Sequence, residues 1–132
     1  MTYARRYSQA QAETASPERL MVLLFDAALR HMQRGAADLE AGDHGSAEPS
    51  LTRAGEIVTE LLCTLDPSRG APDLCDTLGD VYKFVNGRLL EANLRRDPAK
   101  ALEAARVFAP IADGFREAVA RLAVEQQAQV AR

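Results

Sequence analysis

The stretch TASPERLMVLLFD, residues 14–26, combines a helix start with the beginning of an apolar face. The hydroxyl of Ser16 can accept a hydrogen bond from an unpaired amide of the first turn, and Pro17 loses no hydrogen bond at the first helical position. From there apolar residues recur at steps of three and four as far as Leu39, and Gly42 is placed to end the helix. The sequence therefore predicts a long helix over about residues 17–41.

Three further segments show the same helical periodicity, and no segment shows sustained strand alternation. They cover about residues 47–65, 73–96 and 98–122, and the links between them are short and carry glycine, proline, serine or aspartate. Helices joined by such short links run antiparallel to their neighbours. The predicted fold is all-α: an antiparallel up-and-down four-helix bundle over residues 16–122 with a short N-terminal arm.

Caps, prolines and polar stretches indicate where the later helices begin and where the bundle ends. Ser46 is the expected cap of the second helix, and Asp97-Pro98 repeats the capping pair at the start of the fourth. Pro110 interrupts the fourth helix, but the apolar stripe continues on both sides, which favours one kinked helix over two separate ones. Residues 1–15 are too short and polar for a further core helix and form the arm. Residues 123–132 lack a clear apolar stripe and are expected to be frayed or disordered.

Charge and hydropathy exclude two classes of partner. The 132 residues include 16 Lys and Arg against 19 Asp and Glu, which gives a formal net charge of -3. Such a chain lacks the positive excess that releases counterions from a phosphate backbone, so no nucleic acid is expected as a partner. The most apolar stretch, residues 20–25, is far shorter than the roughly 20 residues that span a bilayer. No membrane insertion is therefore expected.

Residue types that carry catalysis or bind metals are sparse. The two histidines, His31 and His44, are not preceded three positions earlier by glutamate, as the Glu-x-x-His motif of a di-metal bundle requires. Cys63 and Cys75 lack a Cys-x-x-Cys spacing and are expected to be reduced, cytoplasmic thiols. No glycine-rich phosphate loop is present. We expect no catalytic residue, no metal and no cofactor, and a function that consists of binding another protein.

Several stretches, in order along the chain, resemble the FliS family of flagellin export chaperones. Residues 14–26, with Tyr7 ahead of them, resemble the start of that family's first long helix. Further matching stretches are Leu51-Thr52-Arg53-Ala54, Ile57-Val58-Thr59-Glu60-Leu61, Leu65-Asp66, Tyr82, Arg88-Leu89, Glu91-Ala92-Asn93 and Asp97. The spacings agree from about Tyr7 to Ala118, so the resemblance covers most of the chain and does not depend on one short motif.

The resemblance implies a cytoplasmic bundle without catalytic activity. Such a chaperone binds the C-terminal segment of flagellin, which is disordered before assembly, prevents its premature polymerisation and delivers it to the flagellar type III secretion apparatus. Contacts with the flagellar export gate and with other flagellar regulators are compatible with this role, and a homodimer is left open. The alternatives are a helical adaptor or regulator that binds a different protein through the same groove, and a metal-dependent helical enzyme.

The resemblance also implies a set of client-binding residues. In the family, the N-terminal segment that carries the tyrosine can lie over part of the client groove in the free protein, which makes Tyr7 the lid residue. Leucines at helical spacing belong more often to the core than to a client contact. Asn93 is the stronger candidate for a client contact, because packing alone does not explain a polar residue near an apolar face. The alternative is that Asn93 makes a structural, cap-like hydrogen bond. The implied set is Tyr7, Leu20, Leu24, Tyr82, Leu89 and Asn93.

Overall fold

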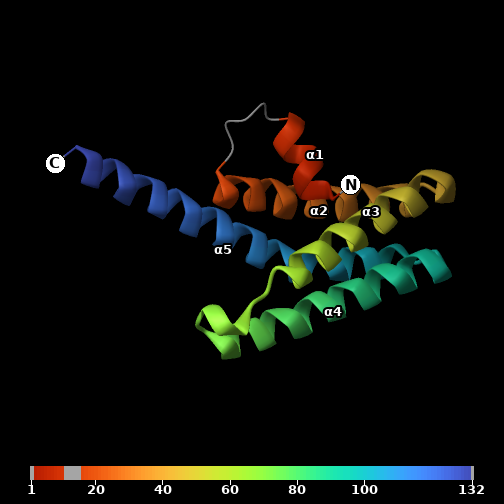
Figure 1. Ribbon diagram of the computed structural model, residues 1–132. Coiled ribbons are helices and arrows are strands. Elements are labelled where there is room, and N and C mark those ends of the chain that lie inside the picture. Colours follow the sequence, from red (N-terminus) through yellow and green to blue (C-terminus); the bar gives the residue numbers. More distant parts are fainter. Residues whose placement is uncertain (1, 11–15, 132) are drawn as a thin grey trace.

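A computed structural model describes residues 2–10 and 16–131, and these residues form helices and no strand. The four long helices close into a ring, because α2 and α4 each pack against both α3 and α5 (Figure 1). This confirms the predicted all-α, antiparallel four-helix bundle with an N-terminal arm. The elements are α1 Tyr3–Ala10, α2 Pro17–Glu40, α3 His44–Cys63, the short 3₁₀ helix η1 Pro67–Arg69, α4 Pro72–Arg95 and α5 Pro98–Val130.

Both ends of α2 form as the sequence predicts. The Ser16 hydroxyl oxygen accepts a hydrogen bond from the amide of Arg19 at 3.2 Å, and Pro17 occupies the first helical position. At the other end Gly42 has a φ of 77°, which glycine adopts without a steric penalty. Its amide donates to the carbonyl oxygen of Leu39 at 3.1 Å. Local hydrogen bonds thus set where α2 begins and ends, without contacts to the other helices.

The start of α3 differs from the prediction, because Asp43 and not Ser46 is the cap. An Asp43 carboxylate oxygen accepts a hydrogen bond from the amide of Ser46 at 3.1 Å, and hydrogen bonding to Ser46 lowers the pKa of that carboxyl. Aspartate caps a helix as well as serine does, and a cap accepts from the amide three positions later. Ser46 therefore supplies that amide, and the helix begins at His44 instead of residue 47.

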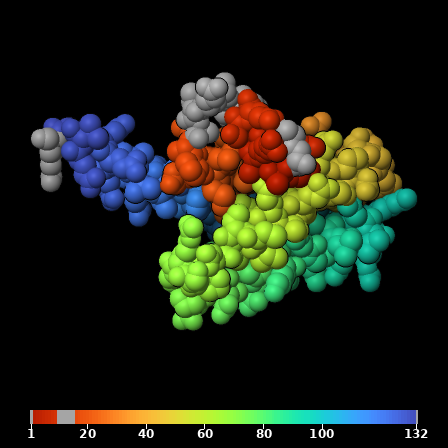
Figure 2. Space-filling view, in the orientation of Figure 1, coloured from red at the N-terminus to blue at the C-terminus, as the bar shows by residue number. Residues whose placement is uncertain are grey.

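The last helix, α5, is longer than predicted. It starts at Pro98, where an Asp97 carboxylate oxygen accepts from the amide of Ala99 at 2.9 Å, and it continues through Pro110 as one helix. The described part of residues 123–132, expected to be frayed or disordered, is helical as far as Val130. Its alanine, glutamine and glutamate residues favour helix without needing an apolar stripe. This part of α5 extends beyond the other helices (Figures 1 and 2).

The core between the long helices is centred on aromatic rings. Phe108 of α5 is fully buried, and its ring centroid lies 5.6 Å from that of Phe25 on α2 and 6.4 Å from that of Tyr82 on α4. Phe25 also contacts Phe115, with 5.0 Å between the ring centroids. These side chains join three helices, so the aromatic cluster fixes how α2, α4 and α5 pack.

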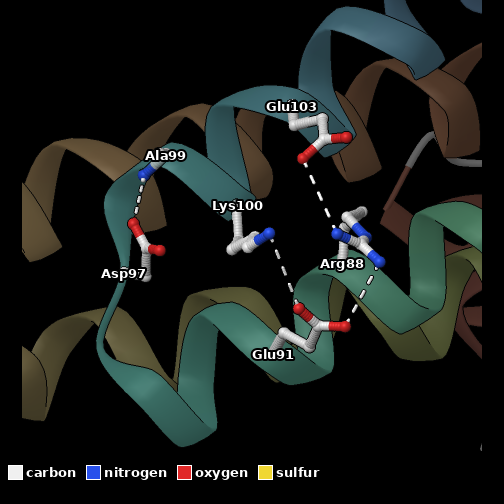
Figure 3. A network of polar contacts seen from close by, with 6 residues as sticks. All are labelled: Arg88, Glu91, Asp97, Ala99, Lys100 and Glu103. Carbon is white, nitrogen blue, oxygen red and sulfur yellow. Dashed lines mark hydrogen bonds and ion pairs between the residues drawn. The ribbon is translucent and has the colours of Figure 1, made fainter.

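Charged side chains link α4 to α5 near the turn between them (Figure 3). The Arg88 guanidinium lies 3.2 Å from a Glu91 carboxylate oxygen and 3.9 Å from one of Glu103, and the Lys100 amine lies 3.8 Å from the other oxygen of Glu91. Single exposed ion pairs stabilise a protein little, whereas a network adds specificity of geometry. This network favours one register between the two helices.

Tyr82 is expected to make the bundle sensitive to alkaline pH. Burial raises the pKa of Tyr82 from 10.0 to about 12, so the folded state holds the phenol proton more tightly than the unfolded chain does. This group should leave stability unchanged below pH 10, and the free energy of unfolding should fall by up to about 2–3 kcal/mol as pH rises from 10 to 12. Thermal unfolding of wild type and Tyr82→Phe across this range checks it. An equal alkaline loss in both proteins would contradict the prediction.

Candidate functional site

The N-terminal helix α1 is anchored to the outside of the bundle by two glutamates of α3. The amides of Tyr3 and Ala4 donate to the two carboxylate oxygens of Glu60 at 3.0 and 2.9 Å. The Tyr3 hydroxyl donates to a carboxylate oxygen of Glu56 at 3.0 Å. Partial burial, and then the hydrogen bond to Glu56, raise the pKa of Tyr3, so this donor keeps its proton above neutral pH. A carboxylate at a helix N-terminus satisfies unpaired amides and interacts favourably with the helix dipole.

One face of α1 packs on the bundle. Tyr3, Ala4 and Tyr7 are half-buried against the core, whereas Arg5 and Arg6 are exposed. The space-filling view shows α1, in red, lying across α2 and α3 (Figure 2). The remainder of the predicted arm, Met1 and residues 11–15, lies outside the described residues. The docked helix shows that this face of the bundle accepts a short amphipathic helix.

A groove of about 420 Å³ lies between α3 and α4, next to α1. Its floor is apolar, because Leu51 and Leu89 are buried there, and Leu90 stands on its rim with 61% of its surface exposed. Glu56 lines the groove and also accepts the hydrogen bond from Tyr3, so groove and arm share one side chain. The groove and the docked helix α1 therefore meet at Glu56, on the surface along α3.

Two asparagine–threonine hydrogen bonds cross the groove. The side-chain amide of Asn86 donates to the hydroxyl oxygen of Thr59 at 3.0 Å, and that of Asn93 donates to the hydroxyl oxygen of Thr52 at 3.4 Å. On each helix the two residues are two turns apart, so the bonds recur at equal spacing along the antiparallel pair. Gly55 lines the groove between them and contributes no side chain. The groove thus combines an apolar floor with hydrogen-bonding walls.

Two of the predicted client-binding residues lie together in this groove, and one lies on the arm. Leu89 forms part of the floor, and Asn93 makes one of the two bonds that cross it. Tyr7 packs α1 against the bundle. Leu89 serves the core and the groove at once, because it is buried in the bundle and still borders the open space.

Three other predicted client-binding residues belong to the helix packing. Leu24 and Tyr82 are buried in the core, where the Tyr82 ring neighbours Phe108. Leu20 is half-buried near the start of α2. The structure therefore does not bring these three side chains to the groove that holds Leu89 and Asn93.

Several groove and anchor residues were not singled out by the sequence pattern. Asn86 and Thr59 could have been found, because each lies two helical turns from a residue that also lines the groove. Glu56 and Glu60 could not, since their partner, Tyr3, is far away along the chain. A glutamate on an exposed helical face gives no local signal of such a contact.

In the part of the chain that the structure describes, no group of three or more His, Cys, Asp or Glu side chains could hold a metal ion. None of the helices of residues 2–10 and 16–131 is both long and apolar enough to span a bilayer. Cys63 and Cys75 are free thiols.

Several known proteins have sequences similar to this chain. A family profile described as "Flagellar protein FliS" matches residues 1–122. The flagellar secretion chaperone FliS of Salmonella typhimurium is 30% identical over 116 residues, which cover 87% of this chain and 85% of that protein. The Escherichia coli protein of the same name is 27% identical over 125 residues, covering 89% and 92%, and the Bacillus subtilis protein is 26% identical over 113 residues, covering 86% and 83%.

A solved structure shares the fold. It is described as "Crystal structure of flagellar chaperone from bacteria" and matches with a TM-score of 0.70, covering 89% of this chain and 94% of that chain. The two sequences are 20% identical, so this likeness shows the fold alone. The family profile spans most of the chain, and a relative at 30% identity is covered along most of its length. The chain therefore belongs to the FliS family of flagellar proteins.

Proposed function

We propose that this protein is a cytoplasmic export chaperone that binds the disordered C-terminal region of flagellin. It prevents premature polymerisation of flagellin and delivers it to the flagellar type III secretion apparatus. Membership in the FliS family supports a flagellar export role without catalysis. The observation that carries the proposal is the surface along α3, where a docked amphipathic helix adjoins an open groove with an apolar floor.

This surface suits an amphipathic client segment. Apolar side chains of the client would be buried over Leu89 and against Leu90, which stabilises the complex by about 25 cal/mol per Å² of apolar surface removed from water. Polar side chains beside them would meet Asn86 and Asn93 at the walls. Ordering a disordered client lowers the net affinity, which suits a chaperone that must later release it.

In this proposal α1 is a lid that competes with the client. It already occupies a face that accepts an amphipathic helix, and Tyr7 contributes a half-buried side chain to that contact. Glu56 connects the two regions, because a client in the groove would compete with Tyr3 for its carboxylate. A short helix with few buried contacts opens at low free-energy cost, so it can leave without unfolding the bundle.

Tyr7→Ala is expected to loosen α1 selectively. Truncating a half-buried aromatic side chain should speed hydrogen exchange of the amides in residues 3–10 by about tenfold, while the helicity of the bundle stays unchanged. Ser8→Ala, at an exposed position of the same helix, is the matched control and should leave exchange as in wild type. If the amides of α1 already exchange at the rate of an unfolded peptide in the wild-type protein, the lid role is excluded.

Size-exclusion chromatography with flagellin tests the proposed function. Full-length flagellin is expected to elute as a complex with this protein, and flagellin that lacks its C-terminal segment is expected to elute separately. Complexes with both forms would show that this protein binds another part of flagellin. Failure to bind either form would refute the chaperone role and favour a helical adaptor for a different protein.

A further inference from the structure

Three arginines from two helices gather around His31 on α2. Arg30 and Arg34 flank it on its own helix, and Arg53 lies on the neighbouring helix α3, close enough for its charge to act on the imidazole. The three arginine side chains are exposed, whereas His31 is half-buried among them. We refer to these four residues as the arginine patch. The chain as a whole is negatively charged, so the patch is a local inversion of its charge.

The arginine patch lies beside a tightly packed contact between α2 and α3. Gly35, next to Arg34, lies so close to α3 that a Cβ atom there would be 2.4 Å from a methyl carbon of Leu51. Leu51 is itself buried, and Arg53 follows it within the same turn. Tight packing fixes the positions of the helices from which the arginines project. The charges are therefore presented at defined places and not on a loop.

The arginines of the patch have no carboxylate partner within the described residues. The ion pairs found there involve other cations, namely Arg69, Arg88, Lys100 and Arg116. Arg30 and Arg34 are one helical turn apart, a spacing at which like charges destabilise a helix. On α3, Glu56 accepts a hydrogen bond from α1. No ion pair among the described residues therefore offsets the repulsion within the patch.

We propose that the arginine patch is a docking surface for an acidic peptide segment of a partner protein. Arginine guanidinium groups bind carboxylates through paired hydrogen bonds, and three exposed groups on one rigid face can engage several glutamates or aspartates. A nucleic acid fits less well, because the net charge of -3 repels a polyphosphate at long range. The proposal does not require the partner to be flagellin.

His31 gives the proposed contact a measurable signature. Burial, and then the charges of Arg53, Arg30 and Arg34, lower the pKa of this imidazole. Carboxylates that dock on the arginines would offset their charges, so the pKa of His31 rises in the complex. A group whose pKa rises on binding takes up a proton, so the affinity increases as pH falls through the titration range of His31.

The test uses the full chain, isotope-labelled, in an NMR titration with three probes. These are a short peptide of alternating glutamate and serine, the same peptide with glutamine in place of glutamate, and single-stranded DNA of equal charge. We expect the acidic peptide to shift the amide signals of the arginine patch and raise the pKa of His31, and the glutamine peptide to do neither. Absence of these shifts, or tighter binding of the DNA than of the acidic peptide, would overturn the proposal.

Charge-reversal variants distinguish an effect of the arginine patch from an effect of the protein's net charge. Arg30→Glu and Arg34→Glu are each expected to weaken binding of the acidic peptide by about tenfold. Arg106→Glu, at an exposed position of α5, makes the same change in net charge and is expected to leave the affinity within about twofold of wild type. Circular dichroism establishes that each variant is folded. An equal loss in Arg106→Glu and in the patch variants would contradict the proposal.

Discussion

Replacing Phe108 by alanine is expected to lower the free energy of unfolding by about 3–5 kcal/mol. The side chain is fully buried, and its ring neighbours those of Phe25 and Tyr82. Removing the ring loses its buried apolar surface and leaves a cavity bordered by α2, α4 and α5. The structure relaxes only partly around such a cavity, because three helices would have to move together.

Urea unfolding followed by circular dichroism measures this effect. The matched control is Phe84→Ala on α4, where the side chain is 41% exposed and the expected loss is below about 1 kcal/mol. The Phe84 ring centroid lies 5.2 Å from the guanidinium carbon of Arg88 at the surface. A loss in Phe108→Ala no larger than in Phe84→Ala would show that the core is not centred on Phe108.

Gly55→Leu is expected to weaken flagellin binding by at least about tenfold, because the new side chain fills the groove where a client anchor would be buried. The fold should tolerate the change. A Cβ atom at Gly55 would meet Asn86 at 3.6 Å, an ordinary contact, and leucine favours helix more than glycine does. The expected stability is therefore equal to that of wild type or slightly higher.

Gly87→Leu is the control for the groove variant, with binding measured by isothermal titration calorimetry. It makes the same change on α4, where a Cβ atom would have no neighbour within 4 Å, and Gly87 does not line the groove. Flagellin binding should stay within about twofold of wild type. Wild-type affinity in Gly55→Leu, or equal losses in both variants, would place the client elsewhere.

The fold could be predicted from the sequence because its signals are local. Ser16 and Asp97, each followed by proline, mark two helix starts, and both form the expected caps. The prediction was less accurate where two residues could each act as the helix cap, as Asp43 and Ser46 could at the start of α3. It was also less accurate beyond residue 122, where helix propensity acts without an apolar stripe to reveal it.

The surface along α3 was harder to predict, because helical spacing does not distinguish a core position from a groove position. Leu24 and Leu89 carry the same pattern, yet Leu24 lies only in the core and Leu89 also forms the floor of the groove. Asn93 was easier to identify as unusual, since it is a polar residue beside apolar ones. The contact of Glu60 with α1 depends on the tertiary fold and has no counterpart in local sequence.

Photo-crosslinking from position 90 tests most directly whether the groove between α3 and α4 receives the C-terminal segment of flagellin. Leu90 stands exposed on the rim, so a benzoylphenylalanine there leaves the floor intact. The cross-links are expected to map to the C-terminal segment of flagellin. The same group at Leu102, which is 42% exposed on α5 and outside the groove, is expected to give none. Cross-links from position 102 alone, or from position 90 to other parts of flagellin, would contradict the proposed binding site.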